Sequence, residues 1–333
     1  NIEDYIPTAI NSAGTQRLAA GSRIMGSKLG RNAIYIWTDT SLFTMRFVGT
    51  PFTFAYEQVG TNCGLIGQNA AVEVDGAAYW MSDNGFFRYT GRLESMQCLV
   101  EDYVFDDLNT VSNQLIYCGI NNLFGEITWF YPTSTSNTNN RSVTYSYLDS
   151  TRERPIWFTN DSTLYQRSTW QDSAVFGLPH ANRYDAGDDA SFDVIGNTEG
   201  TTIYFQHETG VNQVTASTGP VPIPASITSG DYDITQDQRE GISFRGDGEF
   251  IMRISRIIPD FISQSEDVII KLDLRDYPSD AATTQIYTST TSTNFIDTRA
   301  RARQIALTIS NTAVDSSWKL GTFRLDVHSG GRR

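Results

Sequence analysis

The chain has 333 residues, of which 39% are hydrophobic and 12% aromatic, and its net charge is −13. This composition excludes wholesale disorder and suffices for several packed cores. The acidic excess argues against a basic surface that would hold DNA by neutralising phosphates. No stretch approaches the ~20 apolar residues of a membrane-spanning helix, and no signal peptide is predicted at the start. Because the sequence opens with Asn1 rather than Met, we expect residues to precede it.

Helical signals are nearly absent from the N-terminal part of the chain. Residues 15–31 contain good helix formers together with three glycines, so we expect a loop or a broken helix there. From Ala33 onward, apolar and polar residues alternate, which predicts consecutive antiparallel strands. Segment 71–89 gives the clearest pattern. Its dipeptides Asp75-Gly76 and Asn84-Gly85 are favoured in two-residue type I′ turns, and they predict a three-stranded meander.

Four tryptophans recur at intervals of 43, 49 and 41 residues, each near the end of a short β-type run: Trp37, Trp80, Trp129 and Trp170. A period in the forties that is built from strands and turns is typical of stacked β-blades. We therefore predict an all-β fold with a β-propeller-like body of antiparallel blades, in which these tryptophans form the blade cores. A sugar-stacking role is the alternative for the same four residues.

Further strands are predicted between residues 117 and 159, with polar breaks at 133–140 and at 185–191. Segment 214–226 has three prolines within five residues, which indicates a linker or an extended arm near residue 220. Beyond it, period-two alternation predicts a second β unit. We expect propeller-like blades in residues 1–222 and a C-terminal β domain in residues 223–333.

The residue types that most often carry chemistry show no recognisable spacing. Three cysteines lack the pattern of a zinc site or a disulfide framework, so we expect buried thiols at Cys63, Cys98 and Cys118. The histidines, His180, His207 and His328, show no metal-binding spacing, and for His207 we expect a structural hydrogen bond at a strand end. Four carboxylates could cradle Ca²⁺, but their spacing favours a solvated loop: Asp185, Asp188, Asp189 and Asp193. We predict no enzymatic activity and no cofactor.

An ordered set of motifs runs through most of the chain: TDTSLFTMRFVGTPFTF, NCGLIGQNAAVEVDGAAYWMSDNGFFRYTG, FGEITWFYPTSTSNTNNRSVTYSY, RSTWQD, RIIPDF and WKLGTFRLDVHSGGRR. This set resembles the tail nozzle (hub) family of short-tailed bacteriophages, also called packaged-DNA stabilisation proteins. The resemblance implies a virion protein that is assembled in the bacterial cytoplasm and forms a ring, expected to be a hexamer, below the portal and adaptor. It also implies that the ring closes the tail channel, retains genomic DNA until ejection and docks tail fibres or spikes.

The acidic charge suits a DNA conduit, because many Lys or Arg side chains along a channel would trap sliding DNA. The alternative is that the charge only keeps a virion protein soluble. A receptor- or glycan-binding tail protein without catalysis is the second functional hypothesis, and polar loops such as TSTSNTNN would suit it. A sialidase-like hydrolase is disfavoured, because Ser82 and Asp83 are adjacent and so depart from the S-x-D-x-G turn repeat of such propellers.

An arginine-rich segment occurs near the C-terminus. Arg299, Arg301 and Arg303 alternate with small or polar residues, so an extended strand would present all three on one face, about 6–7 Å apart. Like charges at this spacing repel one another unless acids or phosphates lie opposite. We predict that the three arginines pair with carboxylates at a domain or subunit contact rather than with DNA. The alternative is a solvated edge strand that charge protects from further pairing.

Overall fold

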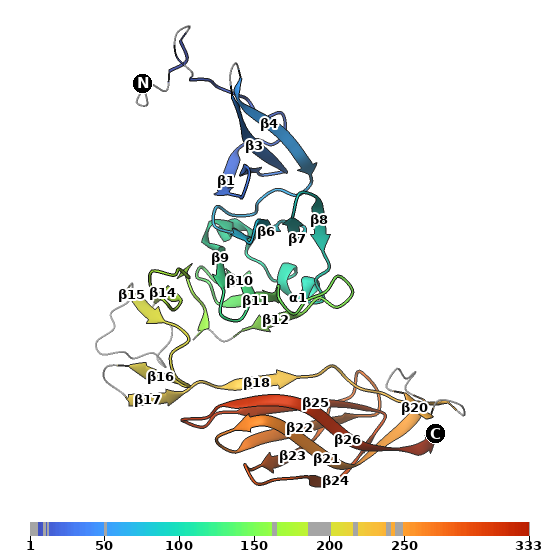
Figure 1. Ribbon diagram of the computed structural model, residues 1–333. Helices are drawn as coiled ribbons and strands as arrows, with labels where there is room; N and C mark the ends of the chain where they lie inside the picture. Colours follow the sequence, from blue (N-terminus) through green and yellow to red (C-terminus); the bar gives the residue numbers. More distant parts are fainter. Residues whose placement is uncertain are drawn as a thin grey trace. The chain divides into compact units, whose positions relative to one another are not determined.

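The computed structural model describes residues 6–8, 11, 13–49, 52–161, 165–185, 201–215, 219–237, 241–243 and 249–332. Antiparallel β-sheets dominate these ranges, and the helices in them are short (Figure 1). The predicted all-β class is therefore confirmed. The chain divides into two compact units, Asn1–Glu208 and Thr209–Arg333. In the described ranges, no helix combines the length and the apolar character needed to cross a membrane.

The first unit contains three four-stranded sheets in which strands that are consecutive in sequence are neighbours in space. The first sheet comprises β1 (Ile24–Leu29), β2 (Ile34–Thr38), β3 (Ser41–Gly49) and β4 (Thr53–Thr61). The second comprises β5 (Ala71–Val74), β6 (Ala77–Ser82), β7 (Gly85–Tyr89) and β8 (Leu93–Met96). The third comprises β9 (Tyr117–Asn121), β10 (Glu126–Tyr131), β11 (Arg141–Ser146) and β12 (Trp157–Asn160). Four-stranded meanders of this kind are the blades of β-propellers.

A three-stranded sheet follows: β13 (Thr169–Gln171), β14 (His180–Asp185) and β15 (Thr201–Gln206). The first strands of successive sheets pack on one another, β1 on β5, β5 on β9 and β9 on β13. A parallel bridge joins Asn69 to Tyr117, and the Cys118 amide donates a hydrogen bond to the Asn69 carbonyl at 2.8 Å. The sheets therefore succeed one another through their first strands, which is a propeller-like arrangement.

The first turn of the 71–89 meander matches its prediction. Asp75 and Gly76 separate β5 from β6, and both have positive φ, 52° and 87°. A type I′ turn requires this conformation at both central positions.

The second turn lies one residue earlier than predicted. Ser82 pairs with Gly85, so that Asp83 and Asn84 are the two turn residues. Gly85 opens β7 and carries the positive φ of 136°. The glycine therefore supplies its conformational freedom where the new strand begins, rather than inside the turn.

Residues 15–31 also differ in part from the predicted loop or broken helix. They are irregular up to Arg23 and then form β1. Only one large apolar residue of this strand, Met25, is buried, so the sequence of the strand does not show the apolar alternation that predicts a β-strand. Short helices occur instead between the second and third sheets, as α1 (Glu101–Phe105) and the 3₁₀ helix Thr110–Leu115.

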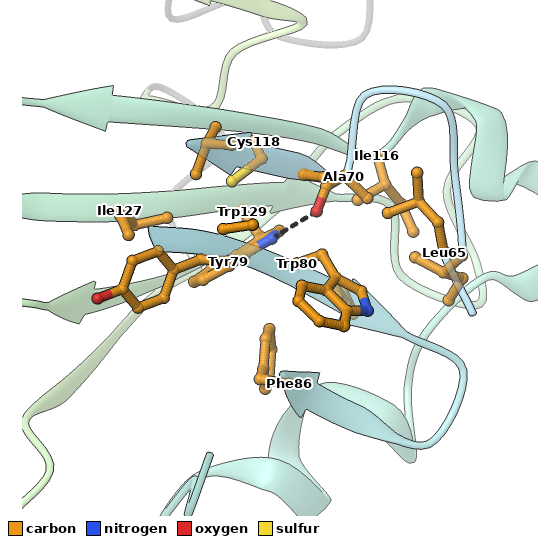
Figure 2. Packing of buried hydrophobic residues seen from close by; sticks show 14 of the residues in the cluster. Leu65, Ala70, Tyr79, Trp80, Phe86, Ile116, Cys118, Ile127 and Trp129 are labelled. Carbon is orange, nitrogen blue, oxygen red and sulfur yellow. Dashed lines mark hydrogen bonds between the residues drawn. The ribbon is translucent and has the colours of Figure 1, made fainter. Parts of the chain in front are cut away.

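The core of the first unit is aromatic. Trp37 packs edge-on against Trp80, and Phe86 lies 4.9 Å from Trp129 between ring centroids. Figure 2 shows Trp80, Phe86 and Trp129 converging in this core. The three cysteines are buried free thiols, as predicted: Cys63, Cys98 and Cys118. Burial raises the pKa of each thiol, to about 11 for Cys98.

The second unit has its own core between two larger sheets. One sheet has the order β18 (Ala225–Thr228), β25 (Gln304–Asn311), β22 (Val268–Arg275) and β23 (Thr283–Ser289). The other has the order β24 (Ile296–Ala302), β21 (Phe250–Gln264) and β26 (Trp318–Arg332). Two hairpins complete the unit, β16 (Asn212–Thr215) with β17 (Gly219–Pro222), and β19 (Thr235–Asp237) with β20 (Gly241–Ser243). Apolar residues of both larger sheets share one buried cluster, which makes the unit a β-sandwich.

The proline-rich segment near residue 220 forms strands rather than a plain linker. Its prolines fall in β17 and in the connection to β18, and β18 pairs with β25 at the edge of its sheet. Proline is tolerated there because a hairpin or edge strand leaves some amide positions unpaired. The compact units divide after Glu208, so that hairpin β16–β17 belongs to the second unit, whereas the predicted division lies at residue 222.

Candidate functional site

The four repeated tryptophans occupy two kinds of position. Trp37, Trp80 and Trp129 lie in β2, β6 and β10, each the second strand of a four-stranded sheet, and all three side chains are fully buried. Trp170 lies in β13, the first strand of its sheet, and is only partly buried. The last interval of the repeat therefore does not lead to an equivalent position.

Indole nitrogens connect neighbouring parts of the first unit. Trp80 Nε1 donates a hydrogen bond to the Cys63 carbonyl at 2.9 Å. Trp129 Nε1 donates to the Ala70 carbonyl at 3.0 Å, as Figure 2 shows. Both acceptors lie in the segment between β4 and β5. Within the described ranges, the buried Trp37 Nε1 has no hydrogen-bond partner. The tryptophans thus fix the first-to-second and second-to-third sheet junctions by polar as well as apolar contacts.

Trp170 fixes the junction of the third and fourth sheets. Its Nε1 donates to the Ile120 carbonyl of β9 at 2.6 Å, and its ring stacks on Phe130. The ring also covers Gly119, where an added Cβ would lie only 2.5 Å from Trp170 Cγ. Gly119 is therefore required by the close approach of an indole ring to the backbone of β9.

His207 serves a structural role beside this junction. Arg167 Nε donates to His207 Nε2 at 3.0 Å, and the imidazole lies 4.5 Å from the Trp170 ring. Burial, followed by the charge of Arg167, lowers the pKa of His207 to about 3. Burial and the nearby Arg183 lower the pKa of Arg167 to about 9. His207 is thus a neutral acceptor at physiological pH and does not exchange a proton there.

Two carboxylates meet at the end of the third sheet. Burial, followed by the negative charges of Glu208 and Asp149, raises the pKa of Glu126. Burial also raises the pKa of Glu208, against the effect of a 2.9 Å hydrogen bond from Asn121 Nδ2. Among the described residues, no three His, Cys, Asp or Glu side chains converge as metal ligands. Of the four carboxylates for which a solvated loop is predicted, Asp188, Asp189 and Asp193 lie outside the described residues.

Two asparagines of the polar loop 133–140 form hydrogen bonds within the chain. Asn139 Nδ2 donates to the carbonyls of Leu115 and Arg167, at 2.8 and 3.0 Å. Asn140 bonds to both the amide and the hydroxyl of Thr133, at 2.8 and 2.9 Å. Asn139 and Asn140 thus hold the loop against the body, whereas Asn137 is exposed.

The arginine-rich segment lies in the second unit, largely as predicted. Arg299 and Arg301 are exposed on β24, and their neighbours Ala300 and Ala302 are buried. Arg303 follows the end of β24, and its guanidinium lies 5.4 Å from the Tyr277 ring centroid. β24 is an edge strand of its sheet, as the alternative interpretation requires. In the described part of the chain, neither Arg299 nor Arg301 has a carboxylate within 4 Å. The described residues of the chain therefore do not supply the predicted acidic partners of these two arginines.

Sequence reasoning missed two residues that share this face. Arg253 of β21 pairs in register with Arg301 on one side and with His328 of β26 on the other. All three side chains are exposed. Period-two alternation places each residue on the outer face of its own strand, but only the strand order and register bring the three together.

No protein-family model matches this chain, and no curated protein matches it either.

Proposed function

We propose that this protein is a structural component of a bacteriophage tail, the nozzle or hub ring that closes the tail channel, retains packaged DNA and docks other tail components. One observation carries the proposal: three consecutive blade-like meanders coincide with the first three members of the tryptophan repeat. The motifs of these meanders resemble those of tail nozzle proteins and follow the same order.

The construction of the first unit supports a role in a rigid ring. A ring that retains packaged DNA must resist deformation at the junctions between its sheets. Here the buried rings of Trp80 and Trp129 and the partly buried ring of Trp170 lie at the junctions, and all three donate hydrogen bonds to main-chain carbonyls. Buried polar contacts of this type specify one arrangement of the sheets, because breaking them leaves unsatisfied groups.

The proposed partners follow from this role. Copies of the chain form the ring, expected to be a hexamer, which contacts a portal-adaptor protein and a tail fibre or spike protein. Genomic DNA passes through the channel without sequence-specific binding, and the net charge of −13 limits its adhesion. The alternative of a glycan-binding tail protein is weakened at loop 133–140, because the side chains of Asn139 and Asn140 bond within the chain.

Electron microscopy of the purified full chain tests the proposal. We expect closed rings with a central opening that admits a DNA duplex, and we expect the same protein in DNA-filled virions by antibody labelling. A protein that stays monomeric over the whole accessible concentration range would overturn the nozzle assignment. Specific retention of the monomer on a glycan array would then favour the receptor-binding alternative.

A further inference from the structure

The outer face of sheet β24–β21–β26 carries a cluster of basic side chains, here called the arginine face: Arg253, Arg299, Arg301 and His328. All four are exposed. Arg301, Arg253 and His328 form a continuous row across the three strands, because Arg253 pairs with both of the others. Arg299 lies two residues from Arg301 and points to the same side.

The two arginines that lie opposite each other in this row, Arg253 and Arg301, are electrostatically unfavourable in the isolated chain. Side chains directly opposite each other on neighbouring strands lie about 4.5–5.5 Å apart at Cβ, and like charges at such positions repel. In the described ranges, Arg253, Arg299 and Arg301 have no carboxylate within 4 Å. The adjacent row is balanced instead: Arg256 pairs with Asp297 and with Asp326, and its Nε lies 3.3 Å from Asp297 Oδ1.

We propose that the arginine face docks on residues 99–106 of a second copy of this chain, here called the α1 segment, and so forms the contact between neighbours in the ring. This inference rests on the proposed function, which it deepens by naming the subunit interface. A contact between two different surfaces, one from each copy, is heterologous, and repetition of such a contact generates a ring when the rotation closes.

The α1 segment has the charge and the spacing that fit the arginine face. Asp102 and Asp106 are both exposed, and Asp106 keeps helical φ/ψ at the C-cap, so the two carboxylates lie one turn apart. Residues four apart on a helix are about 6 Å apart along the axis. Arg299 and Arg301 are about 6–7 Å apart along their strand. Two parallel arginine–carboxylate pairs are therefore geometrically possible between the copies.

Apolar groups beside the charges favour a protein partner over DNA. The Arg256 guanidinium lies 4.5 Å from the ring centroid of Phe295, which is half exposed next to β24. Beside the acids, Leu99 and Tyr103 are exposed on the α1 segment. Aromatic residues and arginine are enriched at protein interfaces. Asp297 and Asp326 at the edge of the arginine face would also repel phosphates.

Charge reversal in the full chain tests the interface. The first variant combines Arg299→Glu with Arg301→Glu, and the second combines Asp102→Arg with Asp106→Arg. A third variant carries all four changes and restores opposite charges across the contact. Arg92→Glu with Arg152→Glu is the matched control, because it makes the same charge change at exposed arginines of the first unit. Ring formation is measured by sedimentation velocity and electron microscopy, and folding by circular dichroism and thermal melting.

We expect the first two variants to stay folded and to need at least tenfold more protein than the wild type to form rings. The variant with all four substitutions and the control should assemble as the wild type does. If either reversal fails to fold, the milder pairs Arg299→Gln with Arg301→Gln and Asp102→Asn with Asp106→Asn replace them. Wild-type rings together with intact rings in the first variant would overturn the interface but leave the nozzle proposal standing. Loss of DNA-fragment binding in that variant would then assign the face to DNA. Absence of wild-type rings would instead overturn the nozzle proposal itself.

Discussion

The buried tryptophans differ in whether the indole nitrogen has a partner, and this difference has a measurable consequence. Trp80 Nε1 bonds to the Cys63 carbonyl, whereas Trp37 Nε1 has no partner in the described ranges. Replacing either tryptophan by Phe removes a similar side-chain volume. Only Trp80→Phe also leaves a buried carbonyl without its hydrogen-bond donor, which costs about 1–3 kcal/mol. In urea unfolding, we expect Trp80→Phe to lower the free energy of unfolding by that much more than Trp37→Phe. Equal losses would show that the hydrogen bond contributes nothing.

Glu126 makes the stability of the first unit depend on pH. Its pKa is raised in the folded state, so between the ordinary glutamate pKa and the raised value the folded chain binds more protons than the unfolded chain. Stability therefore falls as the pH rises through this window, and the penalty is complete above the raised pKa. We expect Glu126→Gln to raise the melting temperature at pH 7 and to have little effect at pH 4. A Glu94→Gln control should lack this gain, because the pKa of Glu94 is lowered by Arg88.

At the scale of elements, the close packing of β9 and β13 predicts a steric effect of a single methyl group. A Cβ on Gly119 would lie 2.5 Å from the Trp170 ring, so Gly119→Ala must displace the indole or the strand. Overpacking of this kind costs about 1–3 kcal/mol. Gly14→Ala is the matched control, since no atom lies within 4 Å of its Cβ position. Thermal melts should separate the two variants, and a Gly119→Ala protein as stable as the control would contradict the packing described here.

Local patterns predict single elements well in this chain and predict their neighbours poorly. Asp75-Gly76 gives the correct turn because both residues adopt the conformation that the dipeptide favours. Asn84-Gly85 gives a turn displaced by one residue, because strand register decides which residues face each other. The spacing of Trp170, which is similar to the earlier intervals, likewise does not reveal that it lies on the first strand of a sheet.

The same limit applies to the arginine face. The alternation in segment 299–302 predicts that Arg299 and Arg301 share the exposed side, as the structure shows. Arg253 and His328 are 46 and 29 residues removed from Arg299 in sequence, and nothing local connects them to it. Strand pairing over such separations depends on the shared core of the second unit, which a single sequence does not reveal.

At the scale of the whole molecule, separate cores predict separate unfolding. The buried cluster of the first unit contains Trp80, and that of the second contains Ile270, with no residue in common. We expect calorimetry of the full chain to resolve two transitions, because each cluster loses its packing independently. Trp80→Ala should lower the free energy of unfolding of the first unit by about 3–5 kcal/mol, and Ile270→Ala should lower that of the second unit by about 2–5 kcal/mol.

The assignment of transitions depends on each variant moving only one of them, so both variants are compared with the wild type under the same conditions. Both residues are fully buried, which makes each substitution a test of its own core. A single transition that both variants shift would show that the two units unfold together, and hence that contacts between them stabilise both. Assembly into the proposed ring would add to the stability of whichever unit forms the subunit contact, so the measurement is repeated at several protein concentrations. If the arginine face of one copy contacts the α1 segment of another, the temperatures of both transitions rise with protein concentration, because each unit contributes one side of that contact.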